Sequence, residues 1–102
     1  MEYVKKFTEY CVSVINSKKV EIPDKKLSQS VRQQEFIVSY KVMTMYLKDA
    51  FYKEGKMIEE QAHRENKTFT LEELKEMQQI GDTKIKEFIK KAENEFLGID
   101  ME

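Results

Sequence analysis

The side chains with the greatest potential for chemistry form an incomplete set. Glu60 and His63 have the Glu-x-x-His spacing with which helical bundles hold paired iron ions. Such a site needs a second copy of the motif and two further carboxylates, but the chain has only one histidine. One chain therefore cannot supply a complete site, and only a symmetric dimer could add the second histidine. Because Gln61 and Ala62 belong to a polar segment, we interpret His63 as a surface residue.

No nucleophile is paired with a base in the sequence. Cys11 is the only cysteine, and it lies among apolar residues at helical spacing, which is typical of a buried, unreactive thiol. The chain has no glycine-rich phosphate loop. The acidic pairs Glu59–Glu60 and Glu72–Glu73 are explained by solvated helix faces. These observations predict a protein that is not an enzyme and has no metal or cofactor.

Composition predicts a single all-α domain spanning residues 1–102. Three glycines and one proline are too few for the many turns of a sheet protein. The net charge of −1 gives no general attraction to nucleic acid or anionic membranes. The chain has sixteen lysines but only two arginines, which counts against a protein that recognises nucleic-acid sequence through base edges. The lone cysteine, the lack of a signal peptide and the lack of a long apolar run predict a cytoplasmic protein without membrane contact.

The first two thirds of the chain predict two helices joined by a connector. Apolar residues recur at spacings of three and four over residues 2–18, which predicts an amphipathic helix. Residues 19–29 contain Pro23 and are predicted to form the connector. A long central helix is expected over 30–64, beginning at a capping-box spacing between Ser30 and Gln33. Its β-branched and aromatic content also suits a strand, but no second segment offers a strand partner.

The remaining segment predicts a helical hairpin, which brings the expected bundle to about four helices. Thr70 and Glu73 have capping-box spacing, so a helix should begin at Thr70. Gly81 suits the left-handed residue that ends such a helix, and Asp82 suits the cap of the next. That next helix has its own apolar face, made by Ile85, Phe88, Ile89, Ala92 and Phe96.

The hairpin resembles a helix-hairpin-helix element, in particular the end of the C-terminal domain of the bacterial RNA polymerase alpha subunit. The shared pattern is Glu73-Leu74, then Ile80-Gly81, then Ile85, Phe88 and Ala92. In that family the turn and the start of the second helix approach the DNA backbone. The resemblance covers under a third of the chain, and it departs at Asp82, where a cation would be expected to meet phosphate.

Two functional hypotheses follow. The first is a non-catalytic regulatory, adaptor or inhibitor protein that docks on another protein, including one that handles nucleic acid. Excess apolar surface on the central helix predicts either that interface or a homodimer, through Tyr40, Val42, Met45, Tyr46 and Tyr52. The alternative is DNA binding by the segment 70–96, through Gly81, Lys84, Lys86, Lys90 and Lys91.

Overall fold

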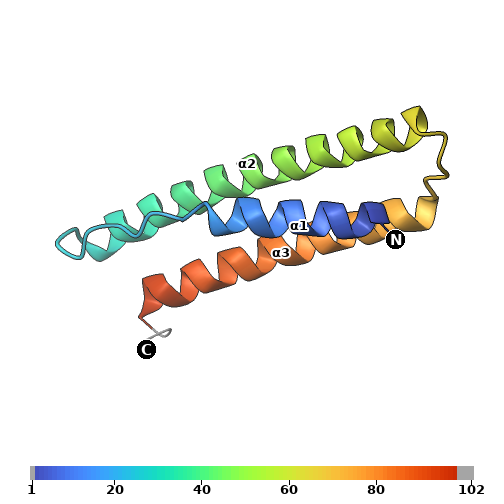
Figure 1. Cartoon of the computed structure of the whole chain (residues 1–102). Coiled ribbons are helices and arrows are strands. Elements are labelled where there is room, and N and C mark those ends of the chain that lie inside the picture. Colours follow the sequence, from blue (N-terminus) through green and yellow to red (C-terminus); the bar gives the residue numbers. More distant parts are fainter. Residues whose placement is uncertain (1, 99–102) are drawn as a thin grey trace.

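The computed structural model describes residues 2–98, and they form a bundle of three helices (Figure 1). These are α1 (Glu2–Asn16), α2 (Gln29–Arg64) and α3 (Leu71–Leu97). Residues 2–98 contain no strand, which confirms the all-α fold class and the helical reading of the central segment. The predicted number of about four helices is wrong, because the C-terminal segment forms one helix.

The predicted hairpin is replaced by an uninterrupted α3. Gly81 lies in the middle of this helix and is buried, and the glycine with positive φ is Gly98, which ends the helix in the left-handed conformation. A Cβ atom on Gly81 would lie 3.3 Å from Cδ2 of Phe51 and 3.7 Å from Cζ of Phe7. The glycine therefore serves close helix packing, and it makes no turn.

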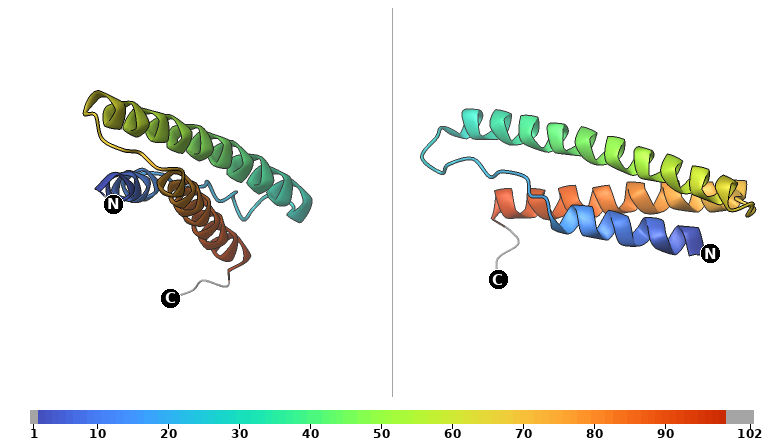
Figure 2. Two further views of the ribbon diagram at one scale, coloured as in Figure 1. Left: turned by 90° about the vertical axis from the view of Figure 1, so that its right-hand side faces the viewer. Right: turned by 45° about the horizontal axis from the view of Figure 1, so that its top comes forward.

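The three helices form an elongated body with extents of 57 × 24 × 20 Å. The chain runs along α2 in the direction opposite to α1 and α3, as Figures 1 and 2 show from three sides. The short α1 covers only the part of the α2–α3 pair that contains the C-terminal half of α2. The other part is covered on this side by the connector that follows α1.

The main core lies where all three helices meet. Its buried members from α1 are Tyr3, Val4, Phe7 and Cys11; those from α2 are Leu47, Phe51, Ile58 and Ala62; those from α3 are Met77 and Ile85. The Phe51 ring packs edge-to-face with Phe7 and with Tyr10, at centroid distances of 6.1 and 6.3 Å. These contacts fix α1 against the inner side of α2.

A smaller second core lies where the connector replaces α1. Val20 of the connector is buried with Phe36 and Ala92, and Ile22 packs beside them. Phe36 also stacks on Phe96, with ring centroids 4.4 Å apart. The connector therefore supplies apolar cover that a fourth helix would otherwise have to provide.

Side-chain caps fix where the two long helices begin. Thr70 and Glu73 form the predicted capping box: Thr70 Oγ1 accepts a hydrogen bond from the Glu73 amide at 3.1 Å, and the Thr70 amide donates to Glu73 Oε1 at 3.0 Å. The cap of α2 is Ser28, whose Oγ accepts from the Val31 amide at 3.3 Å. The predicted start at Ser30 is therefore displaced by one residue, to Gln29.

Candidate docking surface

Helix α2 carries two apolar stripes on opposite sides. Successive residues of a helix are turned by about 100° around its axis. Residues at the spacing of the core members therefore share one side, which we call the inner stripe: Phe36, Met43, Leu47, Phe51, Ile58 and Ala62. A second set is turned by roughly half a revolution and forms the outer stripe: Val38, Val42, Met45 and Tyr52.

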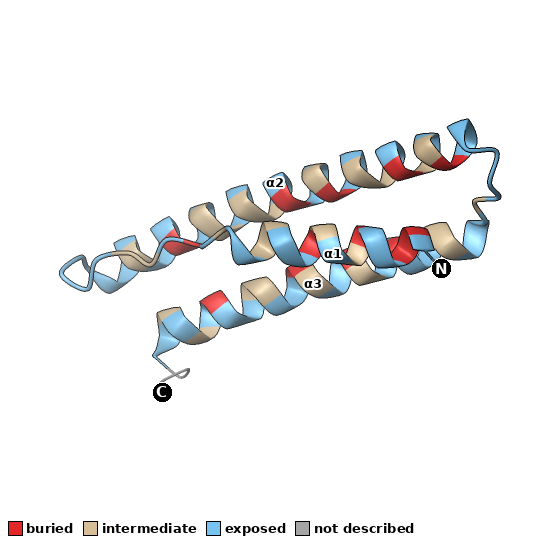
Figure 3. Ribbon diagram, in the orientation of Figure 1, coloured by how far each residue is buried: buried red, intermediate tan, exposed pale blue. Residues whose placement is uncertain are grey.

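The outer stripe is exposed along its length. Val38 and Val42 are each 61% exposed, Met45 is 70% exposed and Tyr52 is 67% exposed. By contrast, Leu47 on the inner stripe has no exposed surface. Figure 3 shows this division as buried colour along the edge of α2 that faces the other helices and exposed colour along the opposite edge. Among residues 2–98, no element covers the outer stripe.

Two of the five predicted interface residues lie elsewhere. Tyr40 is half-buried and packs on Phe36, with ring centroids 5.6 Å apart, so it belongs to the second core. Tyr46 is exposed on one flank of the outer stripe, and Lys18 Nζ lies 4.8 Å from its ring centroid. Val42, Met45 and Tyr52 do lie on one exposed face. Val38 lies on the same face, although it is not among the five predicted interface residues.

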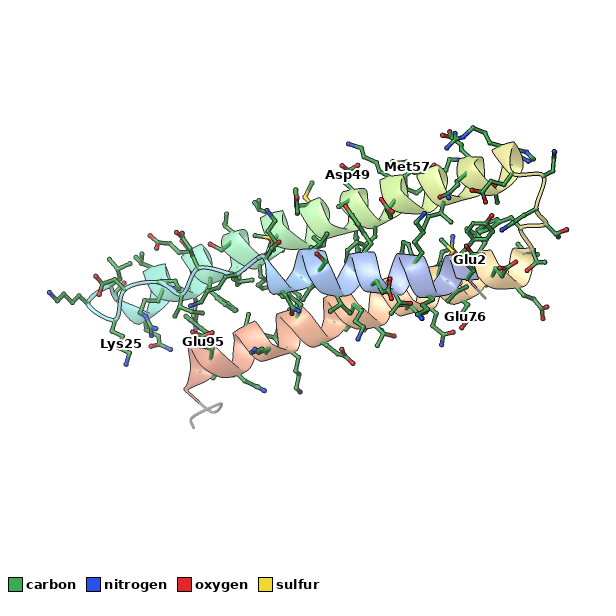
Figure 4. The ribbon with its side chains drawn as sticks, in the orientation of Figure 1. Glu2, Lys25, Asp49, Met57, Glu76 and Glu95 are labelled. Atoms are coloured by element: carbon green, nitrogen blue, oxygen red, sulfur yellow. The ribbon has the colours of Figure 1, made fainter. Side chains whose placement is uncertain are left out.

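Positive charge dominates the surroundings of the outer stripe. Lys41, Lys48, Lys53 and Lys56 are all exposed between Val38 and Met57, and the exposed acidic residue in that interval is Asp49. Asp49 forms an ion pair with Lys53, four residues further along the helix, with 3.0 Å between Asp49 Oδ2 and Lys53 Nζ. Figure 4 places Asp49 on the edge of α2 that is turned away from α1 and α3. Within residues 2–98, Lys41 and Lys48 form no ion pair, although Lys48 lines the same hollows as Asp82 of α3.

The lysines proposed to meet DNA do not share one face of α3. Lys84 and Lys91 are seven residues apart and line a hollow beside the end of α1. Lys86 and Lys90 line a different hollow, between α2 and α3. Gly81 is buried in the middle of α3, lines neither of these hollows and presents no turn to a phosphate. The DNA-binding hypothesis therefore lacks the hairpin geometry on which the resemblance rested.

The residues considered for catalysis lie apart. Cys11 is fully buried in the main core, and burial raises the pKa of its thiol to about 12, so the nucleophilic thiolate is suppressed. Glu60 and His63 are exposed near the C-terminal end of α2. Residues 2–98 bring together no group of three or more histidine, cysteine, aspartate or glutamate side chains that could hold a metal ion.

A polar cluster closes the inner side of α2 at its C-terminal end. Glu65 accepts hydrogen bonds from the Tyr3 hydroxyl at 2.8 Å and from Gln61 Nε2 at 3.0 Å. The bonds from Gln61 and Tyr3 hold the pKa of the Glu65 carboxyl below its usual range. The pKa of Tyr3 is raised to about 12, chiefly because the residue is buried and to a lesser extent because its hydroxyl donates to Glu65. This cluster fixes the beginning of α1 to the end of α2, and its geometry indicates a structural role.

Comparison of the chain with protein-family models, with curated proteins and with solved structures finds no match. None of the helices within residues 2–98 has the length and apolar character needed to cross a bilayer. The outer stripe of α2 and the lysines around it are therefore the features from which function is inferred.

Proposed function

We propose that this chain is a non-catalytic adaptor, regulator or inhibitor that docks on another protein through the outer stripe of α2. A target that handles nucleic acid remains within this proposal. Three helices position the stripe and leave most of its surface exposed, so it stays accessible on a stiff support. A stiff, preformed helix face loses little conformational freedom on binding, which favours association.

One observation supports the proposal above all: the outer stripe is apolar where folding does not require it to be. Val38, Val42, Met45 and Tyr52 could all be polar without any loss to either core. Contiguous exposed apolar residues are typical of binding surfaces, and tyrosine is a favoured interface residue because it buries a large ring and keeps a polar tip. The face also follows the spacing with which a helix contacts a groove or another helix.

Affinity capture from the native host tests this proposal directly. The bait is the full chain, compared with the double variant Val42→Glu/Met45→Glu. We expect the wild type to retain a stoichiometric protein partner and the double variant to lose it. The two glutamates would replace the central apolar contacts of the interface and would have to be buried without partners.

The matched control is Val12→Glu/Leu71→Glu, which adds the same charge at exposed apolar residues on α1 and α3. Circular dichroism must show that all three chains are equally helical. Retention of the partner by Val42→Glu/Met45→Glu would contradict docking through this face.

A nuclease-treated capture and a direct DNA-binding assay decide between docking and the DNA-binding alternative. If the segment 70–96 binds DNA, duplex binding at low salt must fall steeply as salt rises, because phosphate contacts release bound cations. Lys84→Glu and Lys86→Glu should then each weaken it. A partner that survives nuclease treatment supports protein docking instead.

A further inference from the structure

We infer that the partner segment that covers the outer stripe is an acidic amphipathic helix: an apolar stripe flanked by glutamate or aspartate. This inference rests on the proposed docking function and specifies its chemistry. It uses two observations together, the helical spacing of the exposed apolar residues and the sign of the charges beside them.

The spacing selects a helix as the complementary shape. Along the outer stripe, Val42 follows Val38 by four residues and Met45 follows Val42 by three. Tyr52 follows Met45 by seven, and Asp49 lies between them on the same side, four residues after Met45 and three before Tyr52. Alternation of three and four is the repeat with which two helices pack side by side along a shared seam. The seam extends over about four turns, so a partner helix of similar length would match it.

The flanking charges select an acidic partner. Lys41 and Lys48 lie on one flank of the stripe and Lys53 lies on the other, at positions from which long side chains reach a neighbouring helix. Asp49 is already paired with Lys53. A partner that carries carboxylates beside its apolar seam would therefore meet unpaired cations, and one that carries lysines would be repelled.

A second copy of this chain fits the same face poorly. If two copies of α2 met in antiparallel orientation around Met45, Lys41 of each copy would lie level with Lys48 and Asp49 of the other, so that repulsion would offset attraction and the pair would gain no net charge complementarity. In a parallel pair the two Asp49 side chains would meet across the seam. The charges therefore favour a different chain over the homodimer that the sequence suggested.

An anionic membrane also fits less well. Helices that lie in a membrane interface usually bury tryptophan, phenylalanine or leucine. The outer stripe has none of these, and Asp49 lies within it.

A peptide library provides the test. The library consists of helical peptides about three heptads long with a fixed seam of leucine and isoleucine. Each position beside the seam is either glutamate or lysine, and the full chain is the bait. We expect the retained peptides to carry glutamate at those positions. Three results would overturn the inference. The chain could retain lysine-flanked peptides, it could retain both kinds equally, or it could retain no more peptide than a Val42→Glu/Met45→Glu bait does.

Charge reversal on the protein provides the second readout. Lys41→Glu/Lys48→Glu should raise the Kd of a retained acidic peptide by about tenfold or more and should reduce its dependence on salt. The matched control, Lys5→Glu/Lys75→Glu, changes the net charge equally at exposed positions of α1 and α3, and it should change the Kd by less than about twofold. Equal effects of the two pairs would overturn a local role for Lys41 and Lys48.

Two further measurements separate this inference from the docking proposal. If capture of the native partner is lost in Val42→Glu/Met45→Glu but unchanged in Lys41→Glu/Lys48→Glu, docking stands and the acidic partner is rejected. If capture survives both changes, docking itself is rejected. Binding to phosphatidylserine vesicles that is lost in Val42→Glu/Met45→Glu would also overturn the inference, in favour of a membrane.

Discussion

Both sides of α2 carry a stripe of apolar residues, but the two stripes lie in opposite environments. The inner stripe is enclosed by α1, α3 and the connector, and it provides the centre of both cores. The outer stripe has comparable side chains at comparable spacing, but it is exposed. Core formation explains the residues of the inner stripe and leaves those of the outer stripe without a structural purpose.

This contrast shows how residues needed for stability can be separated from residues available for binding on a single helix. A helix on the surface of a small bundle normally has one apolar side and one polar side. Helix α2 has polar residues mainly on the flanks between its two stripes, including Lys41, Lys48 and Lys53. The pattern is typical of a helix that is covered on two sides, and the chain itself covers one of them.

Leu47 and Met45 provide the sharpest comparison of the two stripes. Leu47→Ala should lower the free energy of unfolding by about 2–5 kcal/mol, because it leaves a cavity in a core where Leu47 has no exposed surface. Met45→Ala, at a residue that is 70% exposed, should change it by less than about 0.5 kcal/mol. Urea unfolding followed by circular dichroism measures both. Similar losses for the two variants would show that the outer stripe is buried in solution, for example by self-association.

The two glycines within helices are expected to respond in opposite directions. Gly81→Ala should destabilise the chain by about 1 kcal/mol net, because the added Cβ would lie 3.3 Å from the Phe51 ring. That ring is held by Phe7 and Tyr10 and has little room to move. At Gly55 the added Cβ would lie 3.8 Å from Met77 Cε, which is an ordinary contact. Gly55→Ala should therefore stabilise the helix by about 1 kcal/mol.

Thermal unfolding of both variants tests this pair. Gly55 lies at the edge of the inner side and lines an open hollow of about 400 Å³ between α2 and α3. If Gly55→Ala instead destabilises the chain, the hollow is more tightly packed in solution than its geometry indicates. If Gly81→Ala stabilises it, the Phe51 ring can yield, and α3 packs against the inner side more loosely than the 3.3 Å approach implies.

Local patterns in the sequence predicted most of the fold. The helix over 30–64 was predicted within one residue of its observed bounds, and the capping box at Thr70 is present. Both depend on neighbours along the chain, which a sequence displays directly. The membership of Val42, Met45 and Tyr52 in one exposed face also follows from spacing alone.

The error at Gly81 had a non-local cause. A glycine ends a helix when it takes the left-handed conformation, but it also permits close packing, and the choice here depends on Phe7 and Phe51, which are distant in sequence. One local signal was available. The spacing of Met77, Gly81, Ile85 and Ala92 continues one helical face without a change of phase, as a single helix requires. The packing of Tyr40 on Phe36 was likewise not visible from spacing, because only the fold brings Tyr40 into the second core.

The smallest expected effect concerns the polar end of the inner side. Glu65 follows the last turn of α2 and accepts the Tyr3 hydroxyl bond at 2.8 Å. Hydrogen bonds from Gln61 and Tyr3 lower the pKa of Glu65 from the ordinary value of 4.5, so the carboxylate stabilises the fold above that pH, and this contribution is lost as the pH falls through the lowered value.

Glu65→Gln removes that titration but leaves an amide oxygen that can still accept from Tyr3. We expect the variant to be slightly less stable than the wild type at pH 7 and the difference to close in acid, because only the wild type loses a charge there. Urea unfolding at pH 7 and in steps to about pH 3 measures the difference. Glu76→Gln, at an exposed carboxylate that makes no ion pair within residues 2–98, is the control. Because Glu65 is exposed, solvent screens its charge and the change in stability should be small. A difference that stays constant with pH would show that the Glu65 charge does not stabilise this end of the inner side.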